Sequence, residues 1–250
     1  MAFKDYFSTQ ARQYTQYRPR YPGKLFEYLS SLTARHELVW DCGTGNGQAA
    51  GDLAQFFDEV IATDPSASQL AHAERHSKVR YLVASAEECP LASASVDLIT
   101  VAQAMHWFDL PSFYEQVRRV GRAGGVLAAW SYGLAQIIPE VDAVVARLYW
   151  DLLGAYWPPE RRLIEERYAT IWFPFDEITA PDFSMTAEWN CHEFLGYLGT
   201  WSAVQKYSEQ QRTAPLKQVE EELRQAWGPA GQIRQIHWPL YLRAGHLRSE

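Results

Sequence analysis

Residues 39–50 read VWDCGTGNGQAA, and this stretch decides the fold class that the sequence predicts. An apolar run ends at Asp41 and is followed by glycines at positions 43, 45 and 47. Glycine adopts backbone conformations that other residues avoid, so this spacing predicts a tight turn between a buried strand and a helix. A turn without side chains also leaves room for a ligand against the backbone.

Strand and helix patterns alternate outward from this turn as far as residue 133. Buried strands are expected at 37–43, 59–64, 79–85, 96–103 and 125–132. The alternation predicts an α/β protein with a parallel sheet and helices on both faces. In such sheets, ligands bind beyond the carboxyl ends of the strands. Asp41, Asp64, Ser85 and Gln103 fall at these ends, so we expect them to share one cleft.

The pattern changes after residue 133. A long amphipathic helix is expected over 139–157, and a second helix over 158–172. Charges of both signs balance in ERRLIEER (160–167), which favours a solvated helix face. A strand at 183–190, further helices and a last extended stretch at 232–247 complete the chain. Pro239 indicates a bend or a strand edge in that stretch.

Composition limits the function classes. The chain has 250 residues, which suits one domain, with a net charge of −7 and a pI near 5.5. An acidic chain without a basic tract has no general affinity for nucleic acid or anionic lipid. The start lacks a signal-peptide core, no apolar run is long enough to span a bilayer, and three widely spaced cysteines favour reduced thiols. We expect a cytoplasmic protein with no metal, no nucleic-acid partner and no membrane partner; its oligomeric state is open.

The glycine spacing discriminates between cofactors. A dinucleotide fold needs a third glycine at position 48, which is Gln48, and no phosphate-loop lysine follows. Asp41 suits a cationic amino group better than a phosphate. Asp64 ends the second strand, where a carboxylate can accept two hydrogen bonds from a ribose diol. Together they predict S-adenosyl-L-methionine, with an NAD-dependent oxidoreductase or a regulatory protein without turnover as alternatives.

Longer motifs extend this prediction. The glycine stretch, VIATDPSASQLAHA, VRYLVASAEECPLASASVDLITVAQAMHWFD and VRRVGRAGGVLAAWSY resemble the class I S-adenosylmethionine-dependent methyltransferases of the type 11 group. The head YTQYRPRYP and the tail segments FLGYLGTWSAVQKY and WPLYLRAG are similar to the trans-aconitate-type small-molecule methyltransferases. The resemblance implies a Rossmann-like, seven-stranded, mostly parallel sheet with helices on both faces, plus a helical lid insertion.

The same resemblance divides the chain. It implies one methyltransferase domain over 1–250, with a cofactor-binding core at 36–133. The segments 134–182 and 191–212 would form a helical cover over the substrate site.

The resemblance also implies roles for residues in the cofactor site. Gly43, Thr44 and Gly45 would line the methionine portion, Asp41 would lie near its amino group, and Asp64 would bind the ribose. The remaining cofactor contacts would be Pro65 and Ser66 at the adenosine, Ala86 and Glu87 at the adenine edge, Gln103 and Ala104 beside the sulfonium, and Tyr14 and Arg18 closing over the cofactor. Asp64 could instead cap the helix that follows it, and Arg18 could pair with a surface acid.

The acceptor is expected to be a small molecule, methylated on a carboxylate or hydroxyl oxygen. A carboxylate needs no base because it is already ionised, whereas a hydroxyl benefits from one. His106, after the fourth strand, is the candidate catalytic base; the alternative is a hydrogen-bonded histidine that shapes the pocket. The candidate substrate-binding residues are Trp107, Trp130, Tyr132, Trp201 and Tyr207, of which Trp130 equally suits the core. RNA and protein acceptors are disfavoured by the charge.

Overall fold

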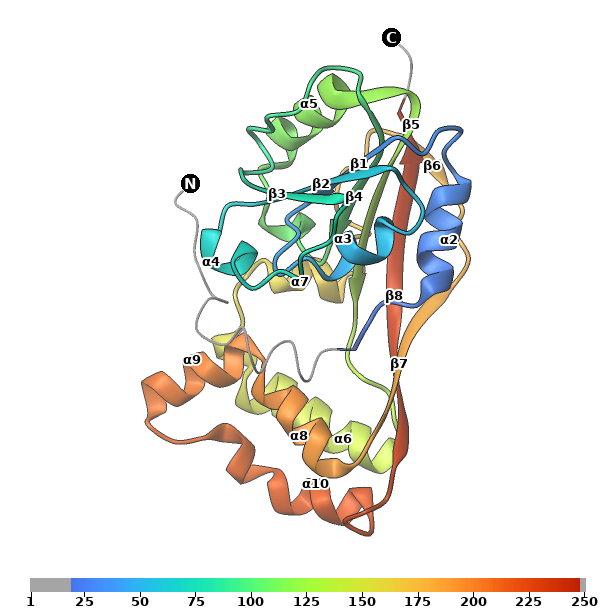
Figure 1. Cartoon of the computed structure of the whole chain (residues 1–250). Helices are drawn as coiled ribbons and strands as arrows, with labels where there is room; N and C mark the ends of the chain where they lie inside the picture. Colours follow the sequence, from blue (N-terminus) through green and yellow to red (C-terminus); the bar gives the residue numbers. More distant parts are fainter. Residues whose placement is uncertain (1–18, 248–250) are drawn as a thin grey trace.

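The strand before the glycine turn lies in the middle of the sheet. A computed structural model describes residues 19–247 (Figure 1). In it, β1 (Leu38–Cys42) runs parallel to β2 (Glu59–Asp64) on one side and to β4 (Val96–Ala102) on the other. Two more parallel strands, β3 (Val79–Val83) and β5 (Gly121–Tyr132), flank these. The expected parallel sheet is confirmed.

A long strand near the carboxyl end completes the sheet. β8 (Arg234–His246) pairs antiparallel with β5, and on its other side with β6 (Asp176–Ile178) and then β7 (Phe183–Trp189). Since β6 and β7 follow each other along the same edge of β8, eight strands fill seven positions, in the order β3-β2-β1-β4-β5-β8-β6. The mostly parallel, Rossmann-like sheet is therefore confirmed. Pro239 lies just beyond the last pair between β8 and β5, where one side of β8 no longer needs a donor.

Side chains that alternate along the central strands build a separate core on each face of the sheet. Val39 packs with α2 (Gly23–Ser31) and α3 (Gln48–Leu53), whereas its neighbour Trp40 packs with α5 (Leu110–Val120) on the opposite face. Strands that are buried on both sides read as continuous apolar runs, which explains the sequence pattern. Helices on both faces are thus confirmed.

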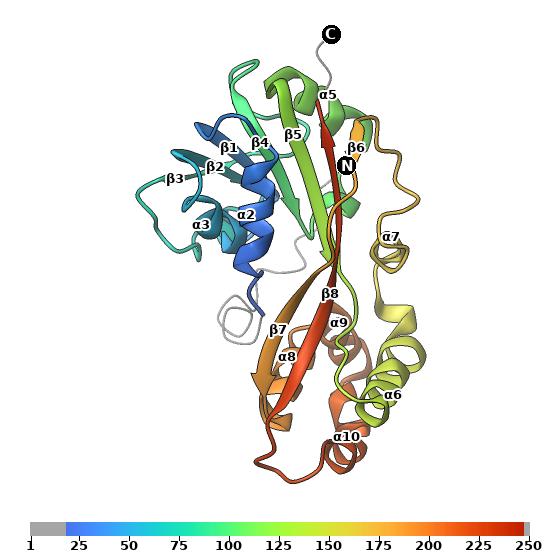
Figure 2. The same ribbon diagram turned by 90° about the vertical axis from the view of Figure 1, so that its right-hand side faces the viewer.

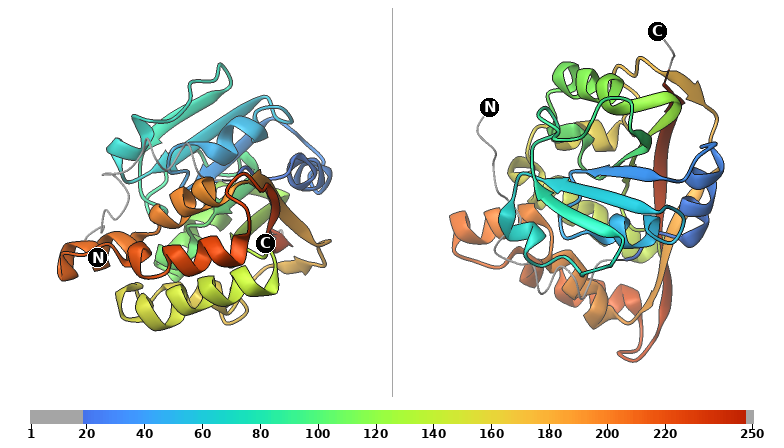
Figure 3. Two further views of the ribbon diagram at one scale, coloured as in Figure 1. Left: turned by 90° about the horizontal axis from the view of Figure 1, so that it is seen from below. Right: turned by 45° about the horizontal axis from the view of Figure 1, so that its top comes forward.

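A second group of helices, which we call the lower helices, lies beyond one end of the sheet. β7 and β8 extend past the other strands and reach α6 (Pro139–Arg147), α8 (Cys191–Gly199), α9 (Ser202–Gln211) and α10 (Glu220–Trp227), as Figures 1 and 2 show. In the view from below, these helices are nearer to the viewer than the sheet (Figure 3, left). Within residues 19–247, every helix is too short or too polar to cross a membrane.

The two helices expected after residue 138 are shorter than the sequence predicts. After α6, the Leu153 N–H bonds to the Leu148 carbonyl five residues back, in a π-helical turn, which leaves the Tyr149 carbonyl for the Trp157 indole N–H at 3.1 Å. The second helix is only α7 (Arg161–Glu165). It is followed by two left-handed residues, 167 and 168, with φ values of 57° and 58°, which a helix cannot include.

Two helices within the sheet region are also short, since α3 ends at Leu53 and α4 covers only Ala67–Leu70. The strand β6 was not predicted, because its three residues carry two charges and no alternating pattern.

Candidate functional site

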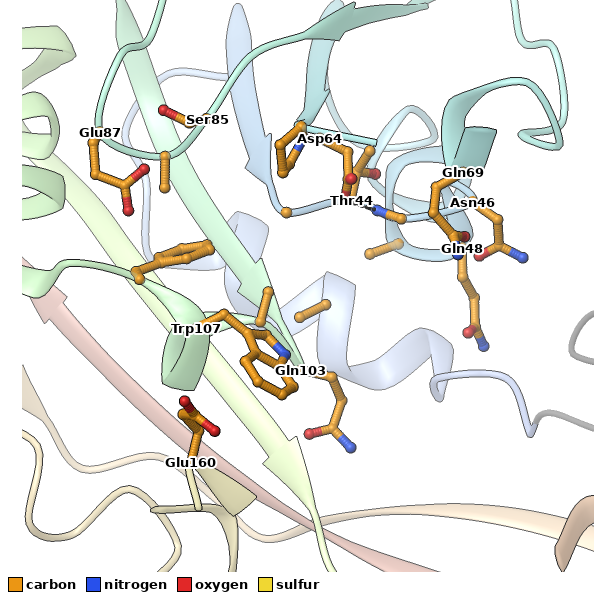
Figure 4. A pocket seen from close by; sticks show the side chains of 18 of the residues that line it. Thr44, Asn46, Gln48, Asp64, Gln69, Ser85, Glu87, Gln103, Trp107 and Glu160 are labelled. Atoms are coloured by element: carbon orange, nitrogen blue, oxygen red, sulfur yellow. Dashed lines mark hydrogen bonds between the residues drawn. The ribbon is translucent and has the colours of Figure 1, made fainter. Parts of the chain in front are cut away.

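A cleft of about 1150 Å³ lies at the carboxyl ends of β1, β2 and β4, and Glu160 borders it on the side opposite Asp64 (Figure 4). The cleft gathers residues from distant parts of the sequence, as expected for the carboxyl ends of parallel strands. The expected site residues that line it are Gly43, Thr44, Gly45, Asp64, Pro65, Ala86, Glu87, Gln103, Ala104, Trp107 and Tyr132.

The glycine turn forms one wall of this cleft. Gly43 and Gly45 have φ values of 69° and 59°, a region that side chains disfavour. A Cβ on Gly43 would lie 2.6 Å from the Cβ of Ala104 and 3.2 Å from the ring of Phe108. The N–H groups of Gly43 and Thr44 bond to the Thr63 carbonyl at 2.8 and 3.0 Å, which fixes the turn to β2. The wall therefore consists of backbone, held close to the opposite loop.

Asp64 ends β2 and joins this wall. Its carboxylate accepts from the Gly45 N–H at 2.9 Å and from the Ser66 N–H at 2.8 Å. The cap of α4 is Ser66, whose hydroxyl accepts from the Gln69 N–H, and Ser66 does not line the cleft. Ser66, and not Asp64, therefore caps α4, while Asp64 lines the cleft.

The structure does not bring Asp41 to the cleft wall. The residue is fully buried, and its two carboxylate oxygens accept from the hydroxyls of Thr44 at 2.5 Å and Thr100 at 2.8 Å. Burial is the largest influence and raises the pKa of Asp41 from 3.8 to about 6, against the lowering effect of both hydroxyls. Asp41 therefore acts behind the wall, where it holds Thr44 in place.

Gln103 follows β4 in a left-handed conformation, with φ of 55°. Its N–H bonds to the Trp130 carbonyl at 2.8 Å, which fixes the residue in the cleft wall. Its side-chain oxygen is buried and has no hydrogen-bond partner among residues 19–247. An unpaired buried acceptor is costly, so a donor from a ligand would suit this position. Trp130 itself does not line the cleft and packs edge-to-face against Tyr21 and Phe26 in the core.

His106 also lies behind the wall. Its Nδ1 is 2.9 Å from the Tyr168 hydroxyl, and the residue is only 8% exposed. Burial, assisted by the positive charge of Arg161, lowers the pKa of His106 from 6.5 to about 3, so the ring is neutral at neutral pH. The next residue, Trp107, does line the cleft and is 36% exposed.

Two expected substrate residues lie away from the cleft, among the lower helices. Trp201 packs against Tyr149 and Trp157, and the Tyr207 hydroxyl accepts from the Gln218 amide at 2.9 Å. Neither residue lines the cleft. Tyr14 and Arg18 lie outside the described residues. Among residues 19–247, no three His, Cys, Asp or Glu side chains gather as metal ligands.

Several wall residues were missed by the sequence reasoning, and the most informative is Glu160. The solvated face expected for residues 160–167 is found at Arg162, Glu165 and Arg167, which are exposed. It was wrong at Glu160, which lines the cleft, and at Arg161, whose guanidinium lies over the rings of Tyr149 and Trp157. Nothing in the periodicity distinguishes Glu160 from its exposed neighbours.

The charge of the wall is one-sided. The described lining contains five carboxylates and no lysine, arginine or histidine. These carboxylates belong to Asp64, Glu87, Glu88, Asp109 and Glu160. A wall with this charge favours a cationic ligand and disfavours an anionic one.

A mostly parallel sheet with a glycine turn and an acid at the end of the neighbouring strand is typical of nucleoside-binding enzymes. Comparison with known proteins shows that the chain belongs to the S-adenosylmethionine-dependent methyltransferase family. Residues 40–129 match the family model described as a methyltransferase domain. The nicotinamide-dependent alternative is thereby set aside.

Three relatives illustrate the membership. A protein of Dictyostelium discoideum assigned as a methyltransferase is 35% identical over 247 residues, covering 96% of this chain and 94% of the relative. A protein of Saccharomyces cerevisiae assigned as an S-adenosylmethionine-dependent methyltransferase is 27% identical and covers 82% and 83%. A solved structure from Anaeromyxobacter dehalogenans, assigned as a type II methyltransferase, is 47% identical with a TM-score of 0.88, covering 93% of this chain and 99% of that one.

The residues present fit the S-adenosyl-L-methionine that this family uses. The bare backbone at Gly43 and Gly45 provides a close-fitting wall, and Asp64 places a carboxylate at the next strand end. The unpaired oxygen of Gln103, another residue of the cleft wall, offers an acceptor. The acidic wall matches a cofactor that carries a positively charged sulfur.

Proposed function

We propose that this enzyme methylates a hydroxyl oxygen of a small molecule that enters the cleft beside Trp107. The observation that carries the proposal is the size of the cleft, about 1150 Å³. A single ligand site occupies roughly 300–1,000 Å³, so this volume suits a cofactor and a small acceptor together. The likeness to trans-aconitate-type enzymes remains a prediction from the head and tail motifs.

Of the two acceptor groups expected from the sequence, the charge of the wall supports the hydroxyl. A carboxylate acceptor would enter a wall with five carboxylates and, in its described part, no compensating cation. Like charges at short range oppose binding. An uncharged hydroxyl meets no such penalty.

We also propose that segments 134–182 and 191–212 cover the acceptor. Glu160 supports this for the first segment, because it reaches the cleft from outside the residues that match the family model. Trp201 and Tyr207 would support the cover from behind rather than touch the acceptor, since both pack among the lower helices. A cover of this kind excludes water during transfer.

The residues then have distinct roles in the reaction. When bound, the cofactor supplies an electrophilic methyl group on a sulfonium. The turn at Gly43–Gly45 and the Asp64 carboxylate hold the nucleoside, and Trp107 orients the acceptor. His106 is proposed to position Trp107 through its bond to Tyr168, because a neutral buried ring outside the cleft wall is badly placed to remove a proton. The hydroxyl proton is released to solvent when the product leaves the cleft.

Two measurements test this proposal. Asp64→Asn weakens S-adenosylhomocysteine binding by about tenfold or more in calorimetry, because charged hydrogen bonds contribute more than neutral ones. Asp58→Asn, at an exposed acid just before β2, leaves the affinity unchanged. A screen with a radiolabelled methyl donor then yields labelled ethers from phenols and alcohols. Labelled esters alone, or label only in protein or RNA, would refute a small hydroxyl acceptor.

A further inference from the structure

We infer that the acceptor carries a cationic amine, and that Glu160 binds this amine beside the ring of Trp107. The inference rests on the proposed function, since it describes the acceptor of the same cleft. It names a specificity-determining residue outside the segment that matches the family model. The chemical class of the acceptor is then an amine-bearing hydroxyl compound.

Among residues 19–247, the Glu160 carboxylate lacks a protein partner. Glu160 lines the cleft and is only partly exposed, and its side-chain carboxylate has no hydrogen bond or ion pair within the described part of the chain. A carboxylate without a protein partner is available for a charge-assisted hydrogen bond with a ligand. Three other acids of the wall are engaged. Asp64 accepts from two N–H groups, Glu87 accepts from the Asp109 N–H at 3.0 Å, and the Asp109 carboxylate accepts from the Ser112 hydroxyl. The fifth acid, Glu88, is exposed to solvent.

The two arginines that follow Glu160 in the sequence bind to other groups. The Arg161 guanidinium lies 4.9 Å from the ring centre of Trp157, and its Nε donates to the Tyr149 hydroxyl at 2.8 Å. Arg162 pairs with Glu166 at 3.0 Å on the surface. No cation among residues 19–247 pairs with the Glu160 carboxylate, so a cationic ligand in the cleft is in a position to do so.

Aromatic side chains line the cleft on the same side as the Glu160 carboxylate. Trp107 is 36% exposed and lines the cleft, as does Tyr132. Figure 4 shows Trp107 and Glu160 on the same side of the cleft, whereas Asp64 and Thr44 lie on the opposite side. An ammonium group is attracted both to a carboxylate and to an indole face, so the pair is suited to an amine.

A chain of hydrogen bonds connects the segment of Glu160 to the segment of Trp107. Glu160 immediately precedes α7, and Tyr168, which follows this helix, bonds to His106 next to Trp107. The Tyr168 carbonyl is held in turn by Arg243 of β8 at 2.9 Å. While residues 160–168 are in place, the Tyr168–His106 bond connects the segment of Glu160 to that of Trp107, and such preorganisation favours selective recognition.

Three phenols of similar size and different charge test the inference. Tyramine is cationic, 4-ethylphenol is neutral and 3-(4-hydroxyphenyl)propionate is anionic. Calorimetry on the enzyme saturated with S-adenosylhomocysteine gives tyramine an affinity about tenfold or more above that of 4-ethylphenol, with the anion weakest. Methylation of each phenol is measured in parallel with labelled donor.

The Glu160→Gln variant removes the charge and keeps the size of the side chain. The tenfold preference for tyramine is lost, while binding of S-adenosylhomocysteine and of 4-ethylphenol is unchanged. Glu160→Asp keeps the charge with a shorter reach and retains part of the preference. The matched control is Glu188→Gln, which makes the same change of net charge at an exposed position on β7 and leaves every affinity unchanged.

Several results would overturn the inference. These are equal binding of the three phenols, preference for the anion, no binding of any of them to the loaded enzyme, or a loss of S-adenosylhomocysteine affinity in Glu160→Gln. The last result would assign the carboxylate to the cofactor. If tyramine binds through Glu160 but its hydroxyl is not methylated, the inference stands and the proposed hydroxyl methylation fails.

Discussion

Replacing His106 by asparagine is expected to change how stability depends on pH. In the folded chain, burial lowers the pKa of His106 from 6.5 to about 3. Between these values the unfolded chain binds a proton on this ring that the folded chain does not bind. The contribution of His106 is therefore fully present above pH 6.5 and is lost as the pH falls toward 3.

The magnitude follows from the two pKa values. At pH 5 the unfolded imidazole is mostly protonated, which costs the folded state about 2 kcal/mol relative to pH 8. Asp41 acts in the opposite direction over part of this range, because its pKa is raised to about 6 and the folded chain binds the extra proton there. The comparison of the wild type with His106→Asn removes this and every other shared contribution.

Urea unfolding followed by tryptophan fluorescence at pH 8 and pH 5 measures the effect. The free energy of unfolding of the wild type, minus that of His106→Asn, falls by about 2 kcal/mol between the two pH values. His106→Gln, a second neutral replacement, gives the same shift. If the difference between wild type and variant is the same at both pH values, His106 is not buried in a neutral state, and its exclusion from proton transfer fails with it.

Two further variants test the walls of the cleft. Gly43→Ala is expected to lower the free energy of unfolding by about 2 kcal/mol or more and to weaken S-adenosylhomocysteine binding, because the added Cβ would meet Ala104 and φ is 69°. The control, Gly51→Ala, has nothing within 4 Å of the added Cβ and should be neutral or stabilising in the same thermal unfolding and titration series. Equal behaviour of the two variants would contradict the close approach of the turn to Ala104. Tyr168→Phe leaves His106 without its hydroxyl partner and should lower the free energy of unfolding by about 1–3 kcal/mol. It should also raise KM for the acceptor without altering the affinity for the cofactor. An unchanged KM would show that this bond does not position Trp107.

The strand ends were predictable from sequence because their signal is local. Apolar runs that end in Asp41 and Asp64, with glycines between them, predict the parallel strands, the turn and the cofactor site. Helix lengths were less predictable. The π-helical turn after Arg147 depends on the Trp157 indole taking a backbone carbonyl, a contact that periodicity does not encode.

The position of each acid relative to the cleft wall was not predictable. Asp41 is turned away because Thr100, 59 residues further along, supplies a hydroxyl from the adjacent strand. Glu160 reaches the cleft just before α7, and Tyr168, which follows this helix, bonds to His106, 62 residues earlier in the sequence. Both outcomes depend on contacts between distant segments, whereas the sequence pattern reports only on neighbours.

The pairing of β8 has a mechanical consequence. β8 is bonded to β5 over residues 240–246 and to β7 over residues 234–240, so one continuous backbone ladder joins the sheet to the lower helices. By contrast, residues 138–175, which include Glu160, take part in no strand pairing. Admission of the acceptor and escape of the methylated product are therefore expected to proceed by displacement of this stretch, with amide exchange fast there and slow along β8.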